Sequence, residues 1–404
     1  MTDKKKYSSY RWVILVMVFL ALLPCNYNQY QASILAAELV ERMNMSTQQF
    51  ATVMTAPMLI GFFTGILGGT LADRIGSKLC VAISIFLSAV GCFLRLVSHS
   101  YGMFFLAMLL IGFAGTFLTL CSAKLFAEWF PAEQLGAMMG VMMGAGSVAT
   151  ALSQATTALF SSMNTAFIFG SVWMSVMLVL WLIFVKDRPE GSSVSESVPV
   201  LEPVKKAVKS KNVWILSLVA ACFMGFQLTI ASFYPTALQE KGFSLATAGL
   251  YASLFTFGGF LGNMIIPNIV AKIGVNRPTL LVSGLLGFVF IAIGWLFCDG
   301  IIMAFVIACG GFFACGVLPP VLSYPPSLPE IGVQNAASAS GVVTSIQMLA
   351  GFLLPSYVIT PICSMGGTIN FSMLFILAGI LAALQGVIAL FLPELGTKAL
   401  KEKK

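Results

Sequence analysis

This sequence is nearly free of histidine and has no closely spaced pair of cysteines. His99 is the only histidine among 404 residues, and the nine cysteines stand singly, with no C-x-x-C pair. Protein metal sites are built from several histidine or thiolate ligands at close spacing. We therefore expect no metal site and no cofactor, and we interpret the cysteines as small buried apolar residues.

Charge is scarce as well. Charged residues make up 9% of the chain, whereas soluble globular domains carry roughly 25%. No aspartate or glutamate lies near the middle of any long apolar stretch. These shortages exclude an ordinary cytosolic enzyme, a disordered chain and a small disulfide-linked secreted module.

Long apolar runs are what the chain has instead. Hydrophobic residues make up 58% of it, and the mean hydropathy is +0.95. A helix needs about 20 apolar residues to cross a bilayer, and twelve stretches are long enough. We predict an all-α integral membrane protein with twelve transmembrane helices. The expected spans are 11–34, 48–71, 79–98, 101–123, 136–160, 165–186, 213–235, 246–270, 278–297, 301–324, 337–361 and 370–392.

The basic residues between the spans predict the orientation. With the N-terminus inside, most lysines and arginines fall in loops and tails on that side, and the opposite loops hold only Arg42 and Lys241. Lysine and arginine in short loops are retained in the cytoplasm. We therefore expect a protein of the cytoplasmic membrane with both termini in the cytoplasm. The net charge of +7 is spread over these loops, which argues against a nucleic-acid partner.

One polar stretch divides the chain into two sets of six spans. Residues 187–212 are rich in proline, serine and mixed charge, which is typical of a linker. We expect a six-helix unit over 1–186 and a second over 213–404. Within the linker, residues 202–211 predict a short basic amphipathic helix on the anionic inner leaflet.

The two sets of spans share an internal repeat. An offset of about 198 residues places Gly61 on Gly259 and the segment 72–76 on 270–274. The same offset places the pair 130–131 on 328–329. Several matches at one offset indicate duplication, and two parallel repeats are typical of transporters with a substrate site at the midplane between them.

The loop between spans two and three carries a recognisable motif. The chain reads GILGGTLADRIGSK from Gly65 to Lys78. This resembles the G-x-x-x-D-R-x-G-R/K-R/K loop of the major facilitator superfamily, and topology, repeat and linker extend the resemblance over the whole chain. The resemblance implies two pseudo-symmetric six-helix bundles and rocker-switch alternating access.

The motif also implies a gate. In the family its charges latch the cytoplasmic side closed, so we assign gating roles to Asp73, Arg74, Gly76 and Lys78. Glycine permits a tight turn at the membrane face, and the charges can reach a helix terminus or a partner across the bundles. The alternative is a solvated loop whose charges only set the orientation. In the second repeat Ala271 replaces the aspartate, which predicts a weaker latch there.

Other segments are similar to the nitrate/nitrite porter and cyanate-permease branch of the superfamily. They are AEWFPAEQLGAMMG after span four, ASGVVTSIQMLAGFLLP in span eleven and the terminal LPELGTKALK. Nitrate members of that branch place an arginine in spans two and eight, and this chain has none there. It also lacks the span-four arginine and the span-five G-x-x-x-G-P of drug/proton antiporters. These departures favour uptake or exchange of an organic solute.

Uncharged polar residues at membrane depth are the first candidates for substrate binding. A buried polar group without a partner costs a few kcal/mol, so such residues must face substrate, water or another helix. In span one the candidates are Asn26, Tyr27 and Tyr30. In the other spans they are Gln154, Gln227 and Gln347. Hydrogen bonding between helices is the alternative for each.

Two basic residues are further candidates for binding an anion. Arg95 lies in the outer part of span three, where it could instead extend to the surface. Lys124 ends span four, where it could instead pair with Glu128 one turn later.

These features predict a secondary active or facilitative carrier of a small organic solute, most simply an organic anion. A neutral or quaternary-ammonium solute held by tyrosines and amides is the direct alternative. A membrane enzyme lacks a nucleophile with a base, and a receptor or scaffold would need larger soluble loops. We expect a monomer in the bilayer. The coupling ion, proton or sodium, stays open.

Overall fold

The structure is a computed structural model, and it describes residues 9–187, 201–365 and 368–394. Every regular element among these residues is a helix. Ten helices are long and apolar enough to span a membrane, and α3 and α6 complete the twelve. The first six are α1 (Arg11–Ile34), α3 (Thr47–Ile75), α4 (Ser77–Leu96), α5 (Tyr101–Trp129), α6 (Ala132–Thr156) and α7 (Met163–Phe184).

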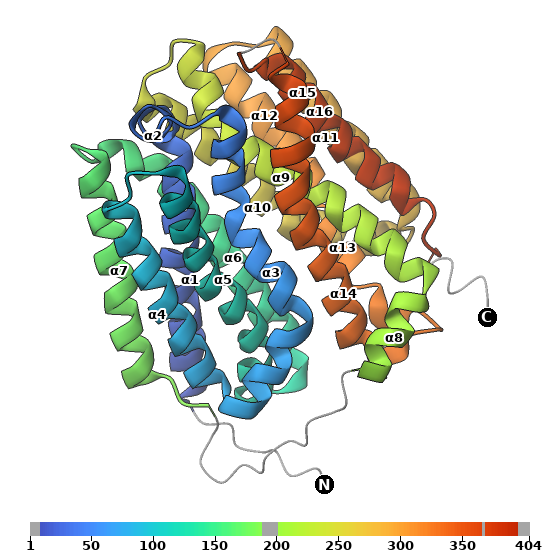
Figure 1. The fold of residues 1–404 in the computed structure, drawn as a ribbon. Coiled ribbons are helices and arrows are strands. Elements are labelled where there is room, and N and C mark those ends of the chain that lie inside the picture. The colour runs from blue at the N-terminus through green and yellow to red at the C-terminus, as the bar shows by residue number, and fades with distance from the viewer. Residues whose placement is uncertain (1–8, 188–200, 366–367, 395–404) are drawn as a thin grey trace, which may run out of the picture.

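The second six follow a short helix in the expected linker. They are α9 (Lys211–Glu240), α10 (Leu245–Ile273), α11 (Arg277–Phe297), α12 (Gly300–Cys315) with α13 (Leu318–Leu322), α14 (Gly332–Leu353) with α15 (Thr360–Cys363), and α16 (Phe371–Ala389). Short helices α2 (Ala36–Met43) and α8 (Leu201–Lys209) lie at opposite ends of the molecule, which we call the α2 end and the α8 end (Figure 1).

The expected spans agree with these helices, with two local corrections. The tenth, expected as one run over 301–324, is interrupted after Cys315. Pro319 and Pro320 have no N–H to donate to the preceding turn, so the chain starts a new helix. In the eleventh, Leu354–Ile359 forms a wider π-helical turn that includes Pro355, a residue that has no N–H for the α-helical hydrogen bond.

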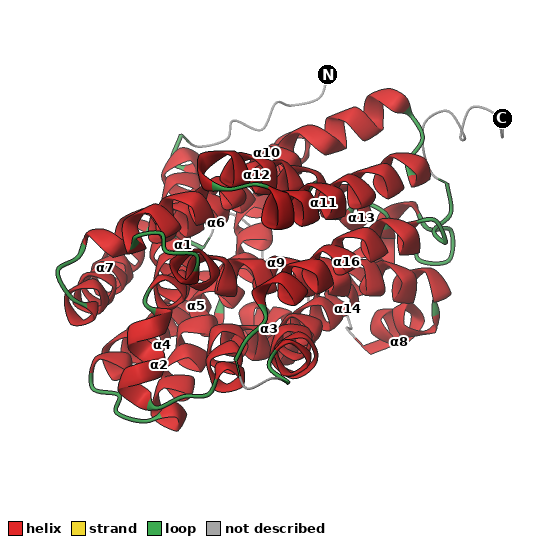
Figure 2. Cartoon of the chain, turned by 90° about the horizontal axis from the view of Figure 1, so that it is seen from above, coloured by secondary structure: helices red, strands yellow, loops and turns green. Residues whose placement is uncertain are grey.

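The helices form two groups of six. The N-terminal group runs from blue to green in Figure 1 and the C-terminal group from yellow-green to red. Figure 2, seen from above, shows the helices of both groups side by side around a common centre, with α9 near the middle. This arrangement is the predicted fold of two pseudo-symmetric six-helix bundles.

A carboxylate caps the start of a helix in the same way in each group. Asp187, after α7, accepts a hydrogen bond at 2.5 Å from the backbone N–H of Lys78 at the start of α4. Glu394, after α16, accepts bonds at 2.8 and 2.9 Å from the N–H groups of Asn276 and Arg277 at the start of α11. The first N–H groups of a helix have no partner within it, and these carboxylates supply one.

Helix α8 confirms the helix predicted within the linker, and it is docked on the C-terminal group. Ala207 is fully buried. Glu330 accepts hydrogen bonds from Ser210 at 2.9 Å and from Asn212 at 2.7 Å. Partial burial raises the pKa of the Glu330 carboxyl, but hydrogen bonds from its own backbone, Asn212 and Ser210 outweigh it, so the pKa lies below its ordinary value.

Candidate binding cavity

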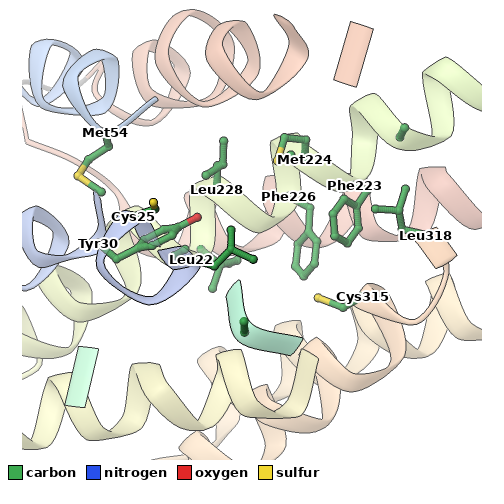
Figure 3. Close-up of a cluster of buried hydrophobic side chains, with 14 of the residues drawn as sticks. Leu22, Cys25, Tyr30, Met54, Phe223, Met224, Phe226, Leu228, Cys315 and Leu318 are labelled. Atoms are coloured by element: carbon green, nitrogen blue, oxygen red, sulfur yellow. The ribbon is translucent and has the colours of Figure 1, made fainter. Parts of the chain in front are cut away.

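A cavity of about 390 Å³ lies between the two groups of helices, near their middle. Figure 3 shows part of its wall, with Leu22, Cys25 and Tyr30 of α1 facing Phe223, Met224 and Leu228 of α9. The volume falls in the range of small-molecule sites, which are mostly apolar with a few polar groups. The polar lining residues are Asn26, Gln29, Tyr30, Thr116, Thr119, Ser147, Thr150, Gln227, Thr256, Asn263, Thr344 and Gln347.

Four of the predicted binding residues line this cavity. Asn26 and Tyr30 come from α1, Gln227 from α9 and Gln347 from α14. Asn26 and Tyr30 are four residues apart, and this spacing puts them on one helix face. The cavity is therefore shared between the two groups, with amide and hydroxyl groups contributed by both.

Two other predicted residues lie outside the lining. The Tyr27 hydroxyl is 2.8 Å from Thr156 Oγ1, and its ring packs against Phe169 and Trp173. Gln154 is fully buried, and its Oε1 accepts a hydrogen bond at 2.7 Å from Thr256 of the other group. Both side chains join helices, which was the alternative that the sequence left open.

Arg95 also lies away from the cavity. Only 1% of it is exposed, so it does not reach the surface. Its Nη1 donates to the Asn28 backbone oxygen at 2.8 Å, and its Nη2 donates to Asn28 Oδ1 and, at 2.7 Å, to Gln31 Oε1. The guanidinium lies 4.2 Å from the ring centre of Phe167. This cationic group therefore joins α4 to α1 through neutral acceptors and to α7 through the ring of Phe167.

The remaining basic candidate and the motif lie toward the α8 end. Lys124 is half-buried and is not part of the cavity lining. The backbone of Asp73 and Arg74 belongs to α3, but their side chains are outside the described residues. Gly76 has φ of +85°, a conformation that favours glycine, and a Cβ there would lie 2.9 Å from Asp187 Oδ2. Lys78 contributes its backbone N–H to the Asp187 cap.

Sequence reasoning missed two amides of the lining. Gln29 is 8% exposed, and its Nε2 has no hydrogen-bond partner among the described residues. Asn263 of α10 lines the cavity, and its Oδ1 is likewise unpartnered there. Gln29 lies between the candidates Asn26 and Tyr30 in the polar segment 26–31 of span one, and Asn263 is one of two asparagines, with Asn268, in the apolar span eight. A polar residue at membrane depth was the available signal in both cases.

The cavity is closed toward the α2 end. There Thr55 Oγ1 lies 2.7 Å from Ser356 Oγ, and the rings of Phe50 and Phe233 are 5.9 Å apart. Both contacts join the N-terminal group to the C-terminal group. On the opposite side the lining residue Thr119 is exposed, so the cavity opens toward the α8 end.

Comparison with known proteins gives consistent matches. A sequence profile described as Major Facilitator Superfamily matches residues 14–355. A gallate transporter of Pseudomonas putida is 24% identical over 363 residues, covering 80% of each chain. The hexuronate transporter of Escherichia coli K12 is 22% identical over 399 residues, covering 92% of this chain and 91% of its own. A Thermus thermophilus protein named "Probable nitrate/nitrite antiporter NarK1" is 26% identical and covers 57% of this chain and 56% of its own.

A solved structure shares the fold. The chain aligns with a bacterial homologue of the human lysosomal transporter Spinster, crystallised in an inward-facing and occupied conformation, with a TM-score of 0.74. The alignment covers 95% of this chain and 97% of that one at 16% identity.

Proposed function

The chain belongs to the major facilitator superfamily, and from this premise we propose that it carries a small organic acid, an anion in bulk solution, by alternating access. The observation that carries the proposal is the cavity between the two groups of helices, closed at one end and open at the other. A rocking motion that closed the α8 end and opened the α2 end would expose the same polar residues to the opposite side.

The proposed orientation puts the α8 end in the cytoplasm. The lysines and arginines of the loops support it, and the cavity then faces inward. We take residues 1–186 and 213–404 as the moving units, residues 187–212 as the linker, and the monomer as the working form in the cytoplasmic membrane.

The substrate class is supported by relatives and lining together. The names of two relatives refer to gallate and hexuronate, both organic acids. The proposed binding residues are Asn26, Tyr30, Gln227 and Gln347, with Gln29 and Asn263 added from the cavity wall. A neutral or quaternary-ammonium solute is the second candidate, because the wall also presents Tyr30, Phe223, Phe255 and Phe260, and aromatic faces attract cations.

Thermal unfolding in detergent tests the substrate class. The purified protein is heated with gallate, 4-hydroxybenzoate, D-glucuronate, nitrate or choline. A ligand at 100 times its Kd stabilises the folded state by about 2.7 kcal/mol. We expect a carboxylate to raise the Tm of the wild type and of Tyr27→Phe, with a smaller rise in Gln227→Leu and Gln347→Leu. Stabilisation by choline alone would replace the organic acid with the cationic candidate.

The gating assignment has its own test. We propose that Asp73, Arg74, Gly76 and Lys78 control closure of the α8 end, as the motif implies. Asp73→Asn removes one charge and keeps the side-chain shape, so we expect an initial transport rate at least tenfold lower with an unchanged Tm. A wild-type rate in Asp73→Asn proteoliposomes would show that the latch is elsewhere.

A further inference from the structure

We propose that this carrier binds its solute in an electrically neutral form, so that a carboxylic acid enters the cavity protonated and the proton crosses on the solute itself. The inference rests on the proposed function and concerns the charge state of the same substrate. It follows from the residues of the cavity wall, from two amide atoms there that have no partner among the described residues, and from the placement of Arg95 and Lys124.

The described cavity wall contains no charged residue. Its titratable groups are Tyr30 and Cys25 on α1 and Cys315 on α12, and the described lining of α3, α5, α6, α9, α10, α13 and α14 contributes none. The ordinary pKa values of a phenol and a thiol are about 10 and 8.5, so these groups are neutral at pH 7. A carboxylate in this cavity would face no counter-charge from the wall.

The basic residues that could have served an anion are placed elsewhere. The Arg95 guanidinium is surrounded by Asn28, Gln31 and Phe167, on the side of α1 and α7. Lys124 lies outside the lining. Arg95, one of the two basic residues predicted to bind an anion, therefore holds helices together.

The wall instead suits a group that both donates and accepts hydrogen bonds. Amides have N–H donors and a carbonyl acceptor, and Asn26, Gln29, Gln227, Asn263 and Gln347 line the cavity from α1, α9, α10 and α14. Gln29 Nε2 lacks an acceptor and Asn263 Oδ1 lacks a donor among the described residues. A protonated carboxyl offers an O–H donor and a C=O acceptor, whereas a carboxylate offers acceptors only.

The energetic comparison sets the expected pH dependence. A carboxylic acid with a pKa near 4 is about one part in a thousand protonated at pH 7. A site that binds only the neutral form therefore has an apparent Kd, measured against total acid, about a thousandfold above its intrinsic Kd. Burial of an ion in a charge-free cavity carries a desolvation penalty that a neutral acid avoids. If the neutral form is bound, each unit of pH above the acid's pKa raises the apparent Kd about tenfold.

The transport step then balances without a proton-binding residue in the wall. On one side a carboxylate takes up one proton from water and the neutral acid enters the cavity. After the bundles rock, the acid leaves and releases that proton on the other side. Net transfer is one carboxylate and one proton, so the step moves no net charge.

Binding of matched neutral and charged probes tests this. The wild-type protein in detergent is titrated between pH 6 and 8 with 4-hydroxybenzoate, 4-hydroxybenzamide and 4-hydroxybenzenesulfonate, and separately with D-glucuronate and D-glucuronamide. We expect the apparent Kd of the acid in at least one series to rise about tenfold per pH unit. The amide of that series should bind with a Kd that changes less than twofold, and the sulfonate should not bind.

The other outcomes contradict the proposal. A Kd for the acids that does not change with pH, or sulfonate binding as tight as that of 4-hydroxybenzoate, would show that the anion itself is bound, while the proposed transport of organic acids would stand. Failure of all five probes to bind would overturn the neutral-acid proposal, and the separate panel with gallate, nitrate and choline shows whether the organic-acid function falls with it.

Discussion

At the scale of single residues, the Arg95 cluster depends on a glycine of α7. A Cβ at Gly170 would collide with Asn28 Oδ1 and lie 2.7 Å from Arg95 Nη2. Because the guanidinium is buried and bonded to neutral acceptors, displacing Asn28 would also leave a buried charge short of partners. We predict that Gly170→Ala lowers the free energy of unfolding by about 1 to 3 kcal/mol, measured as a lower Tm in detergent.

A second glycine gives the matched control. A Cβ at Gly140 of α6 would meet nothing within 4 Å, and alanine is favoured over glycine in a helix by up to about 1 kcal/mol. Gly140→Ala should therefore keep or raise the Tm. Equal melting of the two variants would show that the backbone near Gly170 adapts without cost.

At the scale of helices, the hydrogen bond between Gln154 of α6 and Thr256 of α10 connects the two groups on the closed side of the cavity. Thr256→Val keeps the side-chain shape and removes the donor. Loss of one such bond costs about 1 kcal/mol, equivalent to a roughly fivefold shift of the equilibrium. We predict more of the state opened at the α2 end, measured as longer distances between spin labels at Glu41 and Glu240.

Thr119→Val is the control for this change. Thr119 also lines the cavity, but its hydroxyl donates to Gly115 within its own helix at 2.8 Å. The distance distribution of this variant should match the wild type. The same distribution in Thr256→Val would mean that the α2 end is held closed by the other contacts alone.

The docking of α8 supplies a prediction about pH. The pKa of Glu330 is lowered in the folded protein. The stability that its carboxylate gives to the docking of α8 is therefore fully present above the ordinary carboxyl pKa of about 4.3 and is lost as the pH falls through the lowered pKa. A spin label at Lys206 should be immobile at pH 7 and should become mobile as the pH falls through that lowered pKa. In Glu330→Ala it should be mobile at pH 7 as well.

Glu330→Gln separates the charge from the hydrogen bonds. The amide oxygen can still accept from Ser210 or Asn212 but does not titrate in this range. The label at Lys206 should then stay immobile over the same fall in pH. Mobility that rises equally in wild type and Glu330→Gln would assign the release of α8 to another group.

Helices were easier to predict than the partners of their side chains. The first span was expected over 11–34 and is α1, Arg11–Ile34, because hydropathy and length alone define a membrane helix. The rotation of each helix about its own axis is harder to predict, because spans that are apolar on all faces show no strong periodicity. Asn26 lines the cavity and Tyr27 packs against α7, although the two are neighbours in sequence. The direction in which each side chain points is set by contacts with helices that are distant in the sequence.

At the scale of the whole molecule, the internal repeat of the sequence includes the caps at the starts of two helices. Asn276 lies 198 positions after Lys78, the offset found in the sequence, and each backbone N–H is bonded to a carboxylate that follows the last span of its group. The carboxylates themselves were not predicted as a pair. Asp187 and Glu394 differ by 207 positions, because the segments before them differ in length. Only the structure shows that both groups close the start of their third span in the same way.

This repeated cap predicts additive losses of stability. Removing an N-cap acceptor costs about 0.5 to 2 kcal/mol, so Asp187→Ala and Glu394→Ala should each lower the Tm, and Asp187→Asn and Glu394→Gln should lower it less because one acceptor remains. The two caps share no partner, and changes at independent sites add to within about 0.5 kcal/mol. The double alanine variant should therefore lose the sum of the two single losses, measured by reversible unfolding in detergent. A double loss equal to the larger single loss would mean that the two groups unfold separately, with the less stable group setting the measured transition.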